Sequence, residues 1–225
     1  MQTALATAGL APVFAGNLPA SLPARTAPKS RAGARRAFAA DEEVFAEGDR
    51  ATSFYKVVSG MVRTYKLLSD GRRQISAFHL PGDIFGLEAG EEHRFGAEAV
   101  SETRLVVHRR EPRALAGEDG VLAREMVAAM MDGLERAQEH MMLLGRKSAK
   151  ERIASFLLAL AGRTGEDGAL HLPMSRADMA DHLGLTVESV SRAVTQLERD
   201  GLIGLPPNRR TVVLRNVAAL RHLAE

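Results

Sequence analysis

Three polar residues near position 190 have the chemistry to contact nucleic-acid bases: Glu188, Ser191 and Arg192. Arginine donates two hydrogen bonds to guanine, glutamate accepts one from cytosine N4, and serine contacts either bases or phosphate. On a helix predicted over 186–200, all three lie away from the core face. That core face is formed by Val187, Val190, Ala193, Val194 and Leu197.

The start of this helix also has an ordinary structural explanation. Thr186 is a good N-cap, and Glu188 in the first turn suits the positive end of the helix dipole. A Glu and an Arg four residues apart stabilise an isolated helix by about 0.3–0.5 kcal/mol. The neighbouring segments decide between the two explanations.

The preceding segment, MSRADMADHL, predicts a short helix that is capped by Ser175 with Asp178 and ends at Gly184. A short capped helix, a glycine turn and a second helix with a polar outer face predict a helix-turn-helix. The segment GLIGLPPNRRTVVLRN then predicts two short strands around 206–208, which form a winged hairpin. The inward-facing residues of the first helix are Met179, Ala180 and Leu183.

These elements predict a double-stranded DNA-binding surface with two kinds of contact. Base contacts specify a sequence, whereas phosphate contacts position the protein. We expect Glu188, Ser191 and Arg192 to contact bases. The expected contacts to the DNA backbone are Ser175, Arg176, Thr186, Thr195, Arg209 and Arg210.

Apolar residues at alternating spacings of three and four predict one long helix over 118–146. A second apolar stripe of Leu122, Met126 and Ala129 runs beside the first. One stripe can pack on the chain's own domain and the other on a partner helix, so we expect a parallel homodimer; packing on its own domain alone is the alternative. The predicted dimer seam is Val127, Met130, Leu134, Ala137, Met141 and Leu144.

The segments around the long helix complete an α+β fold. Short β-rich runs separated by turns, such as Ser59-Gly60 and Asp70-Gly71, predict a sandwich or small barrel over 38–117. Ser148 and Glu151 have capping-box spacing and begin a further helix that we expect to end at Gly162. The break near 145–147 is the predicted boundary of a C-terminal domain over 147–225.

The N-terminal 37 residues have a different composition, rich in alanine, proline and basic residues, which predicts a disordered tail over 1–37. This tail holds five basic residues and no acid, and the remaining 25 basic and 28 acidic residues leave −3 elsewhere. The basic pI of about 9.2 therefore reflects the tail and does not itself indicate nucleic acid. Apolar runs are too short for a membrane span, and the N-terminus lacks the charge pattern of a signal peptide, so we expect a cytoplasmic protein.

From Phe38 onwards the chain resembles the Crp/Fnr family of bacterial transcription regulators. Three segments carry the resemblance: FAEGDRATSFYKVVSGMVRTYKLLSDGRRQISAFHLPGDIFG, the long helix, and MSRADMADHLGLTVESVSRAVTQLERDGLI. Glu188, Ser191 and Arg192 match the pattern of the Fnr–FixK branch. The resemblance implies a cyclic-nucleotide-binding-like β-roll, or jelly roll, a dimerisation helix and a winged helix-turn-helix. It further implies RNA polymerase as a partner, a TTGA-N6-TCAA-like palindrome, and activation in a low-oxygen response.

Departures from the family concern the input signal. The chain has no cysteine, which excludes a cysteine-held iron–sulfur cluster and thiol redox control. Cyclic-AMP-binding members carry Gly-Glu and Arg-Ser where this chain has Gly86-Leu87 and Arg94-Phe95. Loss of the acid and of the serine argues against cyclic-nucleotide binding, and we expect no cofactor. Glu88 and Arg94 remain, with an ion pair as their ordinary explanation.

Two other functions are less well supported by the sequence. A regulator gated by haem, nitric oxide or another small effector could use His79, His93, His108 or His140 as an axial ligand, but no pair has metal-site spacing. An enzyme is disfavoured because the chain has no Walker loop, nucleophile elbow or zinc motif. We therefore expect a non-enzymatic DNA-binding regulator.

Overall fold

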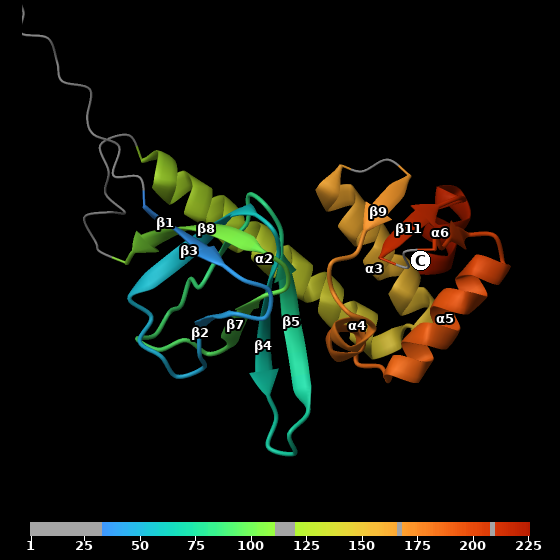
Figure 1. Ribbon diagram of the computed structural model, residues 1–225, viewed down its shortest axis with the longest axis horizontal. Helices are drawn as coiled ribbons and strands as arrows, with labels where there is room; N and C mark the ends of the chain where they lie inside the picture. The colour runs from blue at the N-terminus through green and yellow to red at the C-terminus, as the bar shows by residue number, and fades with distance from the viewer. Residues whose placement is uncertain (1–32, 111–119, 166–167, 208–209) are drawn as a thin grey trace, which may run out of the picture. The chain divides into compact units, whose positions relative to one another are not determined.

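The computed structural model describes residues 33–110, 120–165, 168–207 and 210–225. In the first of these ranges, two antiparallel four-stranded sheets have the orders β1-β8-β3-β6 and β2-β7-β4-β5 (Figure 1). The sheets enclose an apolar interior that includes Phe38, Tyr55, Val62 and Leu105. The strands are β1 (Ala34–Phe38), β2 (Glu43–Phe45), β3 (Ser53–Ser59), β4 (Val62–Leu67), β5 (Arg73–His79), β6 (Ile84–Phe85), β7 (Gly96–Ala99) and β8 (Thr103–Arg109).

The turns between these strands explain several glycines. Gly60 links β3 to β4 with φ of 83°, a conformation that favours glycine. A Cβ atom at this position would lie 2.4 Å from the Glu102 carbonyl oxygen. Gly71 has φ of 82° in the turn between β4 and β5. Both turns were predicted from the sequence, and they fix the hairpin that faces the C-terminal helices.

The predicted tail over 1–37 extends four residues too far, because strand β1 begins at Ala34. Ala34 to Phe38 pair with β8, from Ala34 opposite Val107 to Phe38 opposite Thr103. Strand pairing across the fold therefore recruits Arg35 and Arg36, whose basic character had suggested a tail. Residues 1–32, and residues 111–117 of the predicted β domain, lie outside the described residues.

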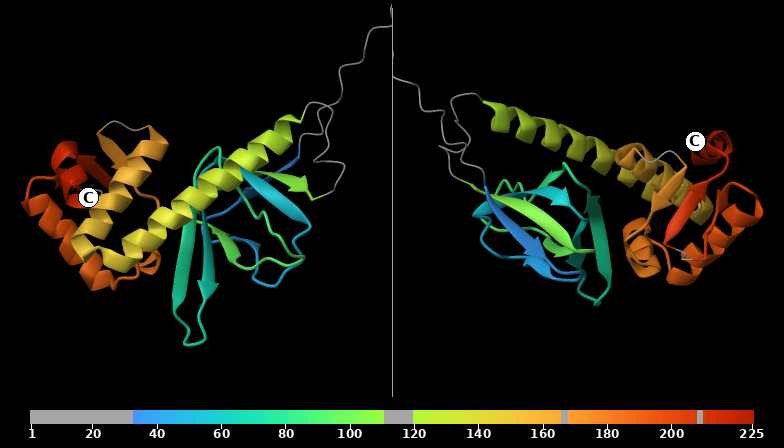
Figure 2. Two further views of the ribbon diagram at one scale, coloured as in Figure 1. Left: turned by 180° about the vertical axis from the view of Figure 1, so that it is seen from behind. Right: turned by 45° about the horizontal axis from the view of Figure 1, so that its top comes forward.

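A long helix, α2 (Val121–Arg146), runs along the β sheets and leads into α3 (Ala149–Thr164) (Figures 1 and 2). Ser148 and Glu151 form the predicted capping box at the start of α3. The predicted end at Gly162 is wrong, because α3 continues to Thr164 and Gly165 adopts the left-handed cap with φ of 65°. A glycine inside a helix costs only about 1 kcal/mol relative to alanine, which the packing of α3 outweighs.

The C-terminal part contains the predicted helix pair and wing together with two elements that the sequence did not reveal. The predicted helices are α4 (Arg176–Leu183) and α5 (Val187–Arg199), and the wing strands are β10 (Ile203–Gly204) and β11 (Thr211–Leu214). Strand β9 (Ala169–His171) adds a third strand beside β11, and α6 (Val217–Ala224) packs against α3. No helix of the described residues is long and apolar enough to cross a membrane.

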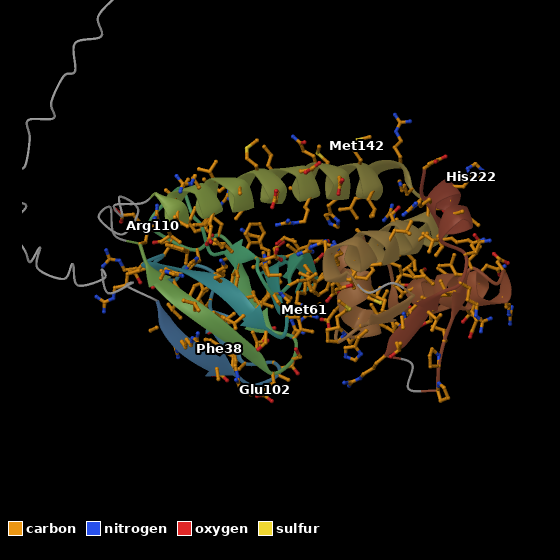
Figure 3. The ribbon with its side chains drawn as sticks, turned by 90° about the horizontal axis from the view of Figure 1, so that it is seen from above. Phe38, Met61, Glu102, Arg110, Met142 and His222 are labelled. Carbon is orange, nitrogen blue, oxygen red and sulfur yellow. The ribbon has the colours of Figure 1, made fainter. Side chains whose placement is uncertain are left out.

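The main core is shared between the β sheets and the C-terminal helices. Met61, between β3 and β4, and Ile75 and Phe78 of β5 belong to the same buried cluster as Ile153 and Leu183. Figure 3 shows Met61 where the sheets meet these helices. Because the cluster is continuous, apolar packing joins the two parts along this junction.

Two half-buried histidines lie at or near the junction. The His79 ring stacks on Phe85 with centroids 4.8 Å apart, and burial lowers its pKa to about 3. The His182 ring stacks on His140 at 4.2 Å, its Nδ1 lies 3.1 Å from the Ile75 carbonyl oxygen, and burial lowers its pKa to about 4. Both rings are therefore neutral in the folded protein near pH 5.

Acidification from pH 7.5 to 5 is expected to destabilise the protein. A histidine in the unfolded chain binds a proton below about pH 6.5, whereas His79 and His182 resist protonation when folded. Stability is thus complete above pH 6.5 and is lost as pH falls toward the folded pKa values. Each histidine should remove about 2 kcal/mol from the free energy of unfolding at pH 5.

Urea unfolding at several pH values measures this effect. His182→Gln should flatten the pH dependence, whereas His222→Gln, at an exposed position on α6, should leave it unchanged. A parent protein whose free energy of unfolding is equal at pH 7.5 and pH 5 would contradict the assignment.

Candidate nucleic-acid interface

The helix pair α4 and α5 is built from two local capping signals and a glycine turn. Ser175 Oγ accepts from the Asp178 amide at 3.0 Å, and Thr186 Oγ1 accepts from the Ser189 amide at 3.2 Å. Between the helices, Gly184 adopts φ of 61°. All three features were predicted from the sequence, and together they set the start of α5.

The buried face of α5, which packs against α3 and α4, holds four of the five predicted core residues: Val190, Ala193, Val194 and Leu197. Val187 is the exception, since 42% of its surface is exposed. It lies at the first position of the helix. Glu188, Ser191, Arg192 and Thr195 are all exposed, as a surface for an external partner requires.

The Glu188 and Arg192 side chains do not pair with each other. No ion pair within 4.0 Å joins them in this described helix, and Arg192 Nη2 makes one long contact of 3.5 Å with Ser189 Oγ. Hydrogen bonding to its own amide and to the Thr186 hydroxyl lowers the pKa of Glu188. Glu188 thus stabilises the first turn of the helix, as its ordinary structural explanation predicts. The Arg192 guanidinium has donors left for a ligand.

The candidate DNA-backbone contacts differ in the hydrogen bonds that their side chains make within the protein. The Ser175 hydroxyl donates to Asp178 at 2.8 Å and the Thr186 hydroxyl donates to Ser189 at 3.1 Å, so both donors are used within the caps. Arg176 Nη1 lies 3.4 Å from Met179 Sδ. Arg210 is exposed beside the wing, and Arg209 lies outside the described residues.

The wing is a small antiparallel sheet. Ile203 and Gly204 pair with Leu214 and Val213, and β11 pairs in turn with β9. A Cβ atom at Gly204 would lie 2.8 Å from Arg215 Nε, so a larger residue there would displace this arginine side chain. The sheet fixes the strand that leads from Arg210 back into the core.

Arg152 positions the helix pair and was missed by sequence reasoning. Its Nε donates to the Lys147 carbonyl at 2.8 Å and its Nη2 to the Leu144 carbonyl at 3.0 Å, at the end of α2. Its Nη1 donates to the Leu183 carbonyl at 2.8 Å, at the end of α4. One guanidinium thus satisfies the free carbonyls of two helix ends and ties the turn to the long helix. Its position in α3 gave no sequence signal for this role.

The outer face of α2 is unusually apolar. Val127, Met130, Leu134 and Met141 of the predicted seam are each more than half exposed, and so are Met131 and Met142. Figure 3 shows Met142 on the side of α2 that faces away from the sheets. Ala137 is also exposed, whereas Leu144 is half-buried against the main core. The second stripe of Leu122, Met126 and Ala129 is half-buried.

In the loop that departs from the cyclic-nucleotide motif, two charged side chains pair with each other. Arg94 Nε lies 3.2 Å from Glu88 Oε2, and the Arg94 amide donates to Glu88 Oε1 at 3.3 Å. The Glu88 side chain is 7% exposed and that of Arg94 is 76% exposed. Gly86 has φ of 75°, and a Cβ atom there would lie 3.1 Å from the Tyr55 ring. The two residues form the ion pair that the sequence suggested.

The four histidines considered as axial ligands lie apart from one another, each stacked on a ring. His93 stacks on Phe45 at 3.7 Å and His108 on Phe54 at 5.0 Å, while His79 and His140 stack as described above. In the part of the chain that the structure describes, no three His, Cys, Asp or Glu side chains gather as a metal site would require.

Comparison with known proteins agrees with this arrangement. Residues 151–223 match the Crp-like helix-turn-helix domain, and residues 35–113 match the cyclic nucleotide-binding domain. The chain is 55% identical over 192 residues to the nitrogen fixation regulation protein FixK of Azorhizobium caulinodans, covering 83% of this chain and 77% of that protein. The chain belongs to the Crp/Fnr family. Within this family it is a FixK-like transcriptional regulator with a helix-turn-helix DNA-binding domain.

Two further Crp/Fnr proteins support the assignment. The structure of FixK2 from Bradyrhizobium japonicum superposes with a TM-score of 0.80 and 47% identity, covering 86% of this chain and 98% of that chain. The transcriptional activatory protein AadR of Rhodopseudomonas palustris is 42% identical over 173 residues, covering 74% of this chain and 72% of that protein. The names of the Azorhizobium and Rhodopseudomonas proteins refer to regulation of nitrogen fixation and to transcriptional activation.

Proposed function

We propose that this FixK-like chain is a homodimeric transcriptional activator that binds a TTGA-N6-TCAA-like palindrome without cyclic nucleotide. The observation that carries the proposal is the exposed polar face of α5, where Arg192 has unpaired donors beside Glu188 and Ser191. In the proposed complex, Arg192 donates to guanine, Glu188 accepts from cytosine, and Ser191 contacts a base or phosphate. Thr195, Arg176, Arg210 and Arg209 then contact the DNA backbone, with the Ser175 and Thr186 helix starts close to phosphate.

The outer face of α2 supports dimerisation through the proposed seam. Exposed apolar side chains that follow one side of a helix are typical of an interaction surface rather than of a solvated one. A two-fold dimer would place two α5 helices about 34 Å apart, one turn of DNA, so that each enters a major groove on the same side. The flexible methionines in the seam give adaptable packing.

Independence from cyclic nucleotide is supported by the Glu88–Arg94 ion pair. The arginine that would otherwise be available to a ligand phosphate is held by a carboxylate, and Leu87 supplies no acceptor for a ribose hydroxyl. Control of such a regulator would lie in its synthesis or turnover.

The branch of the family supports a wider role. FixK and AadR carry names that refer to nitrogen fixation regulation and to transcriptional activation. We therefore place this regulator in the cytoplasm, where it would recruit RNA polymerase to promoters of a low-oxygen response.

Selection from a random-sequence duplex pool tests the proposal without assuming the operator. Purified chain, with no added ligand, should enrich duplexes with TTGA and TCAA half-sites separated by six base pairs. Enrichment of a single unpaired half-site would contradict the dimer, and enrichment of an unrelated sequence would contradict the base contacts.

A further inference from the structure

A cluster of charged side chains crosses the junction between the β sheets and the helix-turn-helix. Arg63 of β4 and Arg73 of β5 both reach Asp178 of α4, at 3.2 Å and 2.6 Å to Oδ1. Arg73 Nε also lies 2.9 Å from Asp181 Oδ2, one turn further along α4. Two strands of one hairpin therefore hold the first helix of the DNA-binding unit.

Burial makes this cluster different from a surface ion pair. The side chains of Arg63 and Asp178 are only 8% and 5% exposed. Arg63 is held on the sheet side by Glu98 at 2.7 Å and by Asp41 at 2.9 Å. Burial alone would lower the pKa of Arg63, but the hydrogen bond to Glu98 and the charge of Asp178 outweigh it and raise the pKa. A charge pair this well enclosed has strict geometry and resists displacement by water.

The two oxygens of Asp178 perform separate tasks. Oδ2 accepts from the amide and the hydroxyl of Ser175, at 2.9 Å and 2.8 Å, and so completes the capping box of α4. Oδ1 accepts from Arg63 and Arg73. One carboxylate thus joins the start of α4 to the sheet, and the orientation of α4 sets that of α5 through their shared core.

We propose that Arg63 and Arg73 are positioning residues for DNA recognition, which hold α4 against the β4–β5 hairpin and so fix the separation of the two α5 helices in a dimer. The proposal rests on the proposed function for its DNA-binding consequence. Where no ligand orients the DNA-binding unit, internal contacts must do so, and this cluster provides such contacts. Loosening the cluster should impair the fit to a two-half-site operator while leaving base preference within each half-site intact.

Operator spacing provides a readout that a purely structural role would not change. Affinities are measured for palindromes with six and with seven base pairs between half-sites, at one salt concentration. Arg73→Gln should weaken binding to the six-base-pair operator about tenfold and reduce the preference for six over seven at least threefold. Arg63→Gln should lower the affinity and the spacing preference in the same way. If Arg63→Gln does not fold, Arg73→Gln alone tests the proposal.

Two variants sharpen the comparison. Arg73→Lys keeps the charge but cannot bridge Asp178 and Asp181 as the forked guanidinium does, so it should restore part of the affinity. Arg72→Gln removes the neighbouring arginine, which is 77% exposed and pairs with Asp70 in its own turn, and should leave affinity and spacing preference unchanged. Parental spacing preference in both Arg63→Gln and Arg73→Gln would overturn the proposal.

A measurement without DNA separates this proposal from the proposed function. Since the chain has no cysteine, Leu68→Cys in the hairpin turn and His222→Cys on α6 create unique sites for a pair of spin labels. With labelled chains diluted into unlabelled protein, Arg73→Gln should broaden the distance distribution, whereas Arg72→Gln should not. If the parent fails to prefer the palindrome but Arg73→Gln still broadens the distance distribution, the operator is refuted and the positioning role is retained. An unchanged distribution in Arg73→Gln would refute the positioning role itself.

Discussion

Arg192→Ala should weaken binding to the TTGA-N6-TCAA palindrome by about 1–3 kcal/mol per half-site, or about 2–6 kcal/mol for both. The reason is that, among the described residues, Arg192 makes only a long contact of 3.5 Å with Ser189 Oγ, so its donors are available to guanine O6 and N7. The same substitution should abolish the penalty for replacing that guanine with another base. Fluorescence anisotropy with matched and single-substituted duplexes at one salt concentration measures both effects.

Arg199→Ala is the matched control for this substitution. Arg199 is exposed on the same helix, in its last turn, and its loss changes the net charge equally. Arg192 would act only through its charge if both variants lost affinity equally and Arg192→Ala still preferred guanine.

Leu134→Lys should dissociate the dimer and thereby abolish cooperative operator binding. Leu134 lies near the middle of the exposed apolar face of α2, with 54% of its surface exposed in the single chain. In a dimer of this variant, the free energy gained by burying two leucines, about 1.5–3 kcal/mol each, is lost. Two lysines also face each other across the seam. The dimer dissociation constant should rise about 1,000-fold, which corresponds to about 4 kcal/mol. Analytical ultracentrifugation over a range of concentrations measures it.

Glu139→Gln is the control on the same helix. This position is exposed outside the seam, and the substitution raises the net charge of the chain by one, as Leu134→Lys does. Circular dichroism should show that both variants keep their helices. A Leu134→Lys protein that remains dimeric at the parental dissociation constant would place the interface elsewhere.

Local signals allowed the DNA-binding unit to be predicted closely from the sequence. The caps at Ser148, Ser175 and Thr186 involve residues only three apart, so their geometry follows from the sequence alone. The spacing of apolar residues likewise distinguished the inner face from the outer face of α2 and of α5. Val187 shows where this reasoning ends, because a helical wheel gives the direction of a side chain but not the extent of the surface that it faces.

Contacts between distant segments could not be predicted in this way. Arg152 contacts carbonyl groups 8 and 31 residues away, and Arg63 reaches Asp178 across 115 residues. Strand β1 forms because β8 is placed beside it, and β9 forms because β11 is. A single sequence records the charges in these contacts but not the tertiary fold that brings them together.

Selective DNA binding by the unliganded dimer is the central element of the proposed function. The decisive measurement is the affinity of tag-free protein, purified without added ligand, for TTGA-N6-TCAA and for a scrambled duplex at the same salt concentration, with and without cyclic AMP. We predict a preference of at least about 1,000-fold for the palindrome, unchanged by the nucleotide. Equal affinity for both duplexes, or selectivity that appears only with cyclic AMP, would contradict the proposed function.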